Sequence, residues 1–139
     1  MERAVFDETP DHIVHLGDHI RDGEELAARF PRIPMTLLPG NCDLGSPEPK
    51  ILTPVLGGVP CLLTHGHTLG VKYDLTRLWY AAREAGARLA LFGHTHRAVI
   101  EEMEGVTLMN PGAAGGSGPS YGVVEIGENG TRSCRIVRL

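Results

Sequence analysis

Four turns rich in glycine, histidine and acidic or amide side chains each follow a short apolar run of the chain. Such a run, bounded by turn residues, is typical of a buried strand in a parallel sheet. Ligands of these sheets bind beyond the carboxyl ends of the strands, so the four turns are expected to gather at one edge. The turns are residues 15–18 (HLGD), 40–43 (GNCD), 64–67 (THGH) and 93–96 (GHTH).

The first part of the chain alternates helices and strands. A helix at residues 2–8 is expected to end at Thr9-Pro10, because proline disfavours helix in the residue before it. Strands are predicted at residues 12–16 and 34–38, with a helix of amphipathic spacing at residues 21–30 between them. A strand, a helix and a strand with short joins indicate a parallel α/β unit.

The rest of the chain turns from α/β to mostly β. Residues 50–64 predict a hairpin that turns at Gly57-Gly58, and residues 74–85 predict a helix that stops at Gly86. A further strand is expected at residues 88–92. The last third is predicted to be mostly antiparallel, with short strands at residues 98–102, 105–109, 121–126 and 132–138.

Length and composition favour a single domain over residues 1–139, large enough for a proper core. A net charge of −4 without a basic stripe argues against binding of a nucleic-acid polymer. The three cysteines form no C-x-x-C pair, and no run of apolar residues is long enough for a signal core or a membrane span. A cytoplasmic location and no membrane partner are therefore expected.

The four turns offer a mixed set of metal ligands. Asp18, Asn41, His65 and His94 bring one carboxylate, one amide oxygen and two imidazoles, which suit Mn, Fe, Ni or Zn better than Ca. Asp18 has two oxygens and could bridge to a second ion roughly 3.5–4 Å away, the spacing of two-metal phosphoesterases. His96 lies two residues after His94, so the two rings could face different ions.

In order and spacing, these turns and the Asn110-Pro111-Gly112 turn resemble the calcineurin-like metallophosphoesterases, and most closely their small bacterial and archaeal branch of manganese-dependent phosphodiesterases. The resemblance runs from about Pro10 to the C-terminus. It implies a four-layer α/β/β/α sandwich with two divalent ions, of which Mn²⁺ is the expected one and Ni²⁺, Fe²⁺ or Zn²⁺ are alternatives. It also implies hydrolysis of phosphodiester bonds in small nucleotide-like substrates by a metal-bound hydroxide, and a homodimer as one expected state.

The same resemblance assigns roles to single residues. Asp18 would bridge the metals, with Asn41, His65 and His94 on one ion and His96 on the other. Cys42 stands where the wider superfamily places a histidine that protonates the leaving group. A thiol is a poor substitute for that histidine, so His67 or a metal-bound water would share the task.

The chain departs from the family at its start. Members of the family open with a strand and an Asp-x-His turn that supplies two ligands to the ion touched by His96. Here the chain begins in what is predicted to be the following helix, so the second metal position is expected to be incomplete. Three explanations stay open: a truncated chain or a wrongly placed start, an intact protein with one good metal site, or a gap filled by another chain.

Several histidines and aspartates also have ordinary structural interpretations. His12 and His19 are expected to be ordinary polar residues, and His15 to have a structural role. Asp18 could cap the helix that starts near Ile20. Asp43 fits a plain Asx turn after Gly40.

A function of a different class also stays open. The same fold serves in eukaryotic retromer as a protein-binding scaffold with little activity, and a fold alone does not establish a function. The alternative to a phosphodiesterase is therefore a catalytically impaired scaffold of this fold, with one metal or none.

Overall fold

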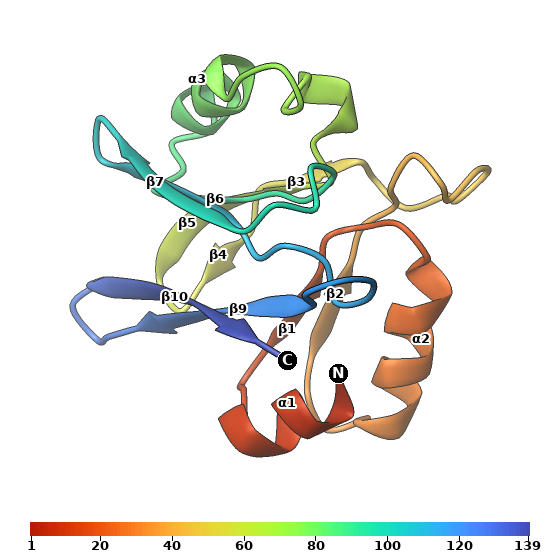
Figure 1. Cartoon of the computed structure of the whole chain (residues 1–139). Helices are drawn as coiled ribbons and strands as arrows, with labels where there is room; N and C mark the ends of the chain where they lie inside the picture. Colours follow the sequence, from red (N-terminus) through yellow and green to blue (C-terminus); the bar gives the residue numbers. More distant parts are fainter.

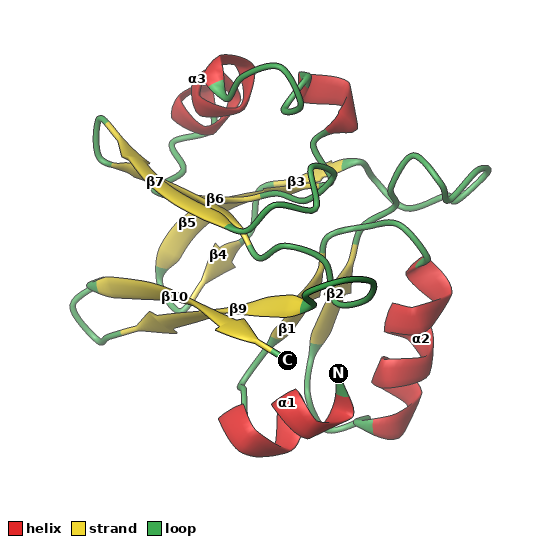
Figure 2. Ribbon diagram, in the orientation of Figure 1, coloured by secondary structure: helices red, strands yellow, loops and turns green.

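Two β layers lie between two helical layers in the computed structural model, which describes all residues 1–139 (Figures 1 and 2). Helix α3 covers one face of a six-stranded sheet, and two smaller strand pairs pack on the other face. Helices α1 and α2 lie outside these strand pairs (Figure 1). The arrangement confirms the α/β/β/α order that the sequence predicts.

The larger sheet has the strand order β3-β5-β6-β8-β7, with β4 paired to β5. Strands β5, β6 and β8 run parallel, so their carboxyl ends share one edge. The last third is mostly antiparallel, as the sequence predicts, but β8 is antiparallel to β7 and also parallel to β6. Strand β8 lies between these two neighbours, and all five of its residues are buried. The strands are β3 (Ile51–Leu52), β4 (Val55–Leu56), β5 (Val59–Thr64), β6 (Leu89–Leu91), β7 (Val99–Met103) and β8 (Val106–Asn110).

Helix α3 (Thr76–Glu84) packs its apolar side on this sheet. Leu78 and Ala82 are four residues apart, so they lie on one face of the helix, and both are fully buried. They contact a cluster that includes Leu62 of β5 and Leu108 of β8. The amphipathic spacing seen in the sequence therefore places the helix as predicted.

The second β layer consists of two separate pairs. Strands β1 (Ile13–His15) and β2 (Met35–Leu37) are parallel, whereas β9 (Ser120–Ile126) and β10 (Arg132–Arg138) form an antiparallel hairpin. Both pairs pack on one core cluster around Leu38 and Leu63, but they are not hydrogen-bonded to each other. The register of β1 with β2 turns the N–H and C=O of Val14 away from β2.

Three helical segments complete the chain: α1 (Glu2–Glu8), α2 (Ile20–Arg29) and the 3-10 turn η1 (His67–Leu69). The end of α1 is tied to the β9–β10 hairpin, because the Glu8 carboxylate accepts a hydrogen bond from the Tyr121 hydroxyl (2.9 Å) and pairs with Arg135. The helices are too short and too polar for any of them to cross a lipid bilayer.

Candidate metal centre

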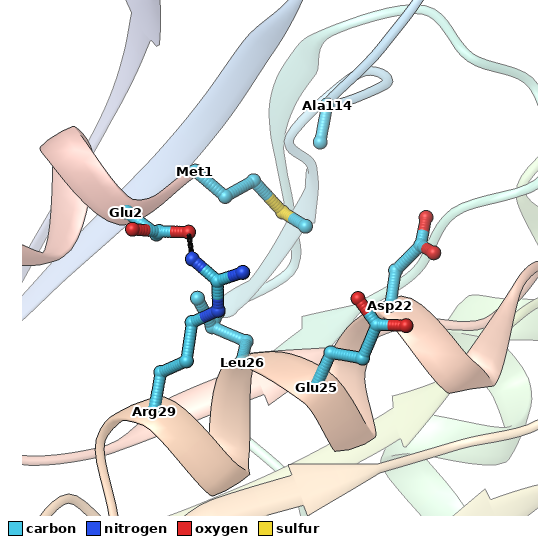
Figure 3. Close-up of a pocket in the computed structure, with 7 residues that line it drawn as sticks. All are labelled: Met1, Glu2, Asp22, Glu25, Leu26, Arg29 and Ala114. Carbon is cyan, nitrogen blue, oxygen red and sulfur yellow. Dashed lines mark hydrogen bonds and ion pairs between the residues drawn. The ribbon is translucent and has the colours of Figure 1, made fainter.

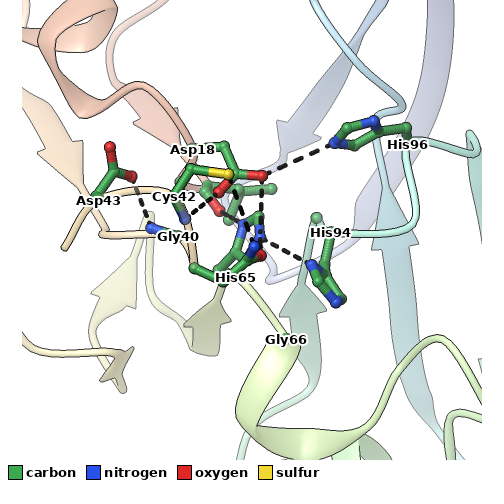
Figure 4. A network of polar contacts seen from close by, with 12 residues as sticks. Asp18, Gly40, Cys42, Asp43, His65, Gly66, His94 and His96 are labelled. Atoms are coloured by element: carbon green, nitrogen blue, oxygen red, sulfur yellow. Dashed lines mark hydrogen bonds and ion pairs between the residues drawn. The ribbon is translucent and has the colours of Figure 1, made fainter.

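The four predicted turns meet where the two β layers face each other (Figure 4). Residues 16–18 and 38–43 follow the parallel strands β1 and β2, and residues 65–67 and 92–96 follow the parallel strands β5 and β6. Hydrogen bonds join neighbouring turns: Gly93 N–H donates to His65 O (3.1 Å), and Cys42 N–H donates to Asp18 Oδ1 (3.0 Å). The structure thus brings together side chains that are up to 78 positions apart, from Asp18 to His96.

His65 is held so that its Nε2 lone pair points at the other turns. The side chain is buried, and its Nδ1 lies 2.8 Å from the Leu16 carbonyl oxygen. A carbonyl can only accept a hydrogen bond, so Nδ1 carries the proton and, in the neutral ring, Nε2 does not. A fixed tautomer of this kind is the usual arrangement of a metal-binding histidine.

Three further donor atoms surround this nitrogen. Asn41 Oδ1 and His94 Nδ1 each lie 3.1 Å from His65 Nε2, and Asp18 Oδ2 lies 3.4 Å from it. Donors that each lie about 2.1 Å from one ion are themselves about 3 Å apart, so these spacings suit a shared cation. The lone pairs of Asn41 Oδ1 and His65 Nε2 cannot satisfy each other, and a cation between them would satisfy both. No group of three or more His, Cys, Asp and Glu side chains is placed to hold a metal ion without help from another residue type. The candidate ligand set therefore depends on the amide oxygen of Asn41.

The backbone at this cluster is unusual. Only six non-glycine residues of the chain have positive φ, and four of them are Asp18, His19, His94 and His96. Such conformations are unfavourable for residues with a Cβ and persist where the surroundings enforce them, typically at functional sites. Three of the four are predicted metal ligands, so the strain supports the site independently of the sequence motifs.

Asp18 is kept ionised by its surroundings. Burial alone would raise the pKa of this carboxyl, but the hydrogen bond from the Cys42 N–H and the neighbouring His65 and His96 bring it below its usual value. Ionised Asp18 can offer oxygens to a cation at neutral pH.

Two glycines allow the first two turns to touch. A Cβ on Gly17, which has φ +98°, would lie 2.7 Å from Gly40 N. A Cβ on Gly40 would lie 2.2 Å from Asp18 Oδ1. Any larger residue at Gly40 would therefore displace the Asp18 carboxylate from its position in the cluster.

Asp43, rather than Asp18, caps helix α2. Its Oδ1 accepts a hydrogen bond from Ile20 N–H (2.9 Å), and its Oδ2 accepts one from Gly40 N–H (2.8 Å). The capping role considered for Asp18 is thus wrong, because its φ of 60° and its bond to Cys42 N–H point the carboxylate into the cluster. Asp43 does not form the plain Asx turn considered for it, because its carboxylate bonds back to Gly40 N–H and thereby joins the turn after Gly40 to α2.

Asn110 has a larger role than the sequence indicates. From the sequence, Asn110 is expected only as part of the Asn110-Pro111-Gly112 turn. The Asn110 side chain is fully buried, and its Nδ2 donates to Gly93 O (2.7 Å) and Thr95 Oγ1 (3.0 Å). Asn110 therefore holds the turn that carries His94 and His96. The sequence shows that Asn110 directly follows a predicted strand, but it does not show these buried contacts.

The second predicted metal position has fewer ligands. His96 Nε2 lies 3.8 Å from Asp18 Oδ2, the same oxygen that faces His65 (Figure 4). The His96 side chain is 65% exposed, whereas that of His65 is 2% exposed. Of the predicted ligands, only Asp18 and His96 would contact a second ion.

The two predicted catalytic residues border the cluster. The His67 ring lies 5.4 Å from the His65 ring between centroids, and its Nδ1 is buried without a hydrogen-bond partner. Burial, followed by the proximity of His65, lowers the pKa of His67. Cys42 is exposed, and its hydrogen bond to Asp18 and the Asp18 charge raise the pKa of its thiol.

The remaining histidines serve the scaffold or face solvent. His12 Nε2 bonds to Thr36 Oγ1 (2.8 Å), which links β1 and β2, and His15 Nδ1 accepts a bond from Gly17 N–H (3.3 Å). His19 is exposed just before α2. None of the three reaches the cluster, in agreement with the sequence prediction.

A hollow of about 340 Å³ between α1 and α2 lies apart from this chemistry (Figure 3). It contains no predicted ligand, and Arg29 and Glu2 pair with each other across it. Its lining residues are Met1, Glu2, Asp22, Glu25, Leu26, Arg29 and Ala114.

Comparison with known proteins agrees with the geometry. The sequence profile described as "Calcineurin-like phosphoesterase superfamily domain" matches residues 2–129. The chain belongs to this superfamily. The probable metallophosphoesterase YsnB of Bacillus subtilis is 36% identical over 104 residues, which make up 74% of this chain and 59% of that relative. The chain thus spans about three fifths of the length of this calcineurin-like relative.

Solved structures with the same fold include both a trafficking protein and an enzyme. Wild-type Vps29 of Entamoeba histolytica complexed with Zn²⁺ has a TM-score of 0.74 at 18% identity, over 97% of this chain and 88% of Vps29. A structure described as a novel archaeal phosphodiesterase has a TM-score of 0.67 at 19% identity, over 97% of this chain and 88% of that one. At these identities the likeness establishes the fold of the calcineurin-like domain.

Proposed function

We propose that this chain carries the centre of a metal-dependent phosphodiesterase that acts on small nucleotide-like substrates. The observation that carries the proposal is the convergence of Asp18, Asn41 and His94 on the unprotonated nitrogen of His65. Membership of the calcineurin-like superfamily supports hydrolase chemistry at such a site. The archaeal phosphodiesterase of the same fold supports the reaction type.

The four side chains are proposed to hold one divalent ion. Mn²⁺ is the expected metal, with Ni²⁺, Fe²⁺ and Zn²⁺ as alternatives of similar ligand preference. When bound, such an ion supplies positive charge to the phosphate oxygens and lowers the pKa of water. The protein contributes a fixed His65 tautomer and an ionised Asp18 carboxylate, so neither of these two ligands has to lose a proton before the ion binds.

Neither Cys42 nor His67 is well suited to protonate the leaving group. The Cys42 thiol keeps its proton because Asp18 raises its pKa, but a thiol of raised pKa is a weak acid. His67 has the opposite problem, since burial lowers its pKa and leaves the ring neutral at pH 7. We therefore propose that water supplies this proton and that His67 helps to orient it through its unpartnered Nδ1.

Hydrolysis of bis(p-nitrophenyl) phosphate with added Mn²⁺ tests the proposal. The wild-type chain is expected to release p-nitrophenol, and His94→Ala is expected to lose this activity. His12→Ala serves as the matched control, because His12 contacts only Thr36 outside the cluster. Equal rates for the wild type and His94→Ala would overturn the proposed function.

A second candidate, an impaired scaffold, is favoured by the sparse second metal position. Only Asp18 and His96 lie there, and His96 is largely exposed. If the chain binds Mn²⁺ but hydrolyses no aryl phosphodiester at any Mn²⁺ concentration, this candidate replaces the enzyme. Hydrolysis that His94→Ala removes would decide for the enzyme.

A further inference from the structure

A hollow of about 520 Å³ opens next to the proposed metal centre and is built from the same two segments. One wall is the stretch after η1, whose Leu69 and Val71 N–H groups donate to Gly66 O in the turn that bears His65. The other wall begins at Thr95, between His94 and His96, and continues to Arg97. The volume lies in the usual range of small-molecule sites, roughly 300–1,000 Å³.

The rim of this hollow carries two cations without partners. Lys72 and Arg97 are both exposed, and neither takes part in any ion pair of the structure. Both side chains line the hollow, and Arg97 directly follows His96 in the chain. The one carboxylate of the hollow, Asp74, uses Oδ1 to accept a bond from Thr76 N–H. In a chain of net charge −4, this rim is a place where an anionic group would bind.

The floor and one side of the hollow suit a planar ring. Phe92 and Val71 are 1% and 4% exposed and give an apolar floor. The Tyr73 side chain stands at the rim and is 93% exposed, which is unusual for a large aromatic residue. Taken singly, an exposed Lys, Tyr or Arg is an ordinary surface residue. Here all three surround one hollow beside the cluster, and base-stacking aromatic rings with neighbouring cations are what nucleotides bind.

We infer that this hollow binds the nucleotide part of the substrate, with the base against Tyr73 and a second phosphate between Lys72 and Arg97. The inference rests on the proposed function, because it places the scissile phosphate at the neighbouring metal centre. It makes Lys72, Tyr73 and Arg97 specificity residues that do not touch the reacting atoms. The substrate class is then a nucleotide with at least two phosphates.

The test is an NMR titration of the ¹⁵N-labelled chain with ADP in EDTA, so that neither metal nor turnover is needed. The amide signals of residues 71–75 and 95–99 are expected to shift in a saturable manner. Arg97→Ala and Tyr73→Ala should each raise the Kd at least about fivefold, as expected for loss of a charge-assisted or stacking contact. Adenosine and inorganic phosphate, which each offer half of the ligand, should bind more weakly than ADP.

Two control variants match these substitutions. Arg32→Ala removes an exposed, unpaired arginine before β2, at the far end of the strand from Gly40, and Tyr80→Ala removes a tyrosine that is 57% exposed on α3. Both should bind ADP as the wild type does. The inference is overturned if ADP shifts no signal of the hollow, if all variants share one Kd, or if adenosine binds as tightly as ADP. Because the hydrolysis assay uses no nucleotide, its failure and the failure of this titration are distinguishable.

Discussion

The Asp18 carboxylate can hold its position only because residue 40 is a glycine, which has no Cβ. A Cβ there would lie 2.2 Å from Asp18 Oδ1 and 2.3 Å from Asp18 N, so Gly40→Ala must displace the proposed ligand. We expect this variant to fold but to lose the rise in Tm that Mn²⁺ gives the wild type. Gly115→Ala is the control, because nothing lies within 4 Å of a Cβ at that position. An undiminished Mn²⁺ effect in Gly40→Ala would show that Asp18 is not a ligand.

Asn110 offers a second test at the scale of one residue. Asn110→Ala leaves the Gly93 carbonyl and the Thr95 hydroxyl without their buried donor, and we expect a loss of about 2–4 kcal/mol in the free energy of unfolding. Urea denaturation measures this loss. Asn129→Ala, in an exposed turn, should change the free energy by less than about 0.5 kcal/mol. Equal stability of the two variants would refute the role assigned to Asn110.

Sequence reasoning found the residues of the cluster because their turns follow apolar strands, and strand ends of parallel sheets meet at one edge. It could not find the roles of Asp43 and Asn110, since both depend on contacts between segments 17 to 23 positions apart. The shared position of Lys72 and Arg97 could not be predicted for a different reason. Exposed basic residues carry no sequence signal until the fold places them round one hollow.

At the scale of elements, α1 is attached to the β9–β10 hairpin by a carboxylate. Hydrogen bonds from Arg135 and then Tyr121 hold the pKa of Glu8 below its usual value of 4.5. The folded state therefore gains stability above that value and loses it as the pH falls through the lower folded pKa. We expect Glu8→Gln to lower Tm at pH 7, and the difference from the wild type to shrink as the pH falls below 4.5 and through the lower folded pKa of Glu8. A difference that stays constant with pH would contradict this attachment.

Helix α3 depends on its buried side for its position. Leu78→Ala should lower the free energy of unfolding by about 2–5 kcal/mol, because it leaves a cavity against the six-stranded sheet. Tyr80→Ala, on the exposed side of the same helix, should cost about 1 kcal/mol or less. Chemical denaturation followed by circular dichroism measures both. Equal losses would mean that α3 does not pack on the sheet as described.

The helices and strands themselves were largely predictable, because the positions of turn residues match the ends of the segments that the spacing of apolar residues predicts. The pairing of β8 with β6 was not, since a short hairpin in the sequence gives no sign of which third strand joins it.

For the whole molecule, two layers of strands bring four turns to one point, where the chain places four candidate ligands for one ion and two for another. The cytoplasmic location, the single domain and the homodimer expected from the sequence stay predictions. This distribution leads us to the central claim that the chain has one strong metal position and one weak one. The strong position is formed by Asp18, Asn41, His65 and His94, and the weak one by Asp18 and His96.

Calorimetric titration of Mn²⁺ into the metal-stripped chain tests this claim most directly. We expect one tightly bound ion per chain, lost in Asn41→Ala and in His94→Ala but retained in His96→Ala. Absence of binding, or unchanged binding in Asn41→Ala and His94→Ala, would contradict it.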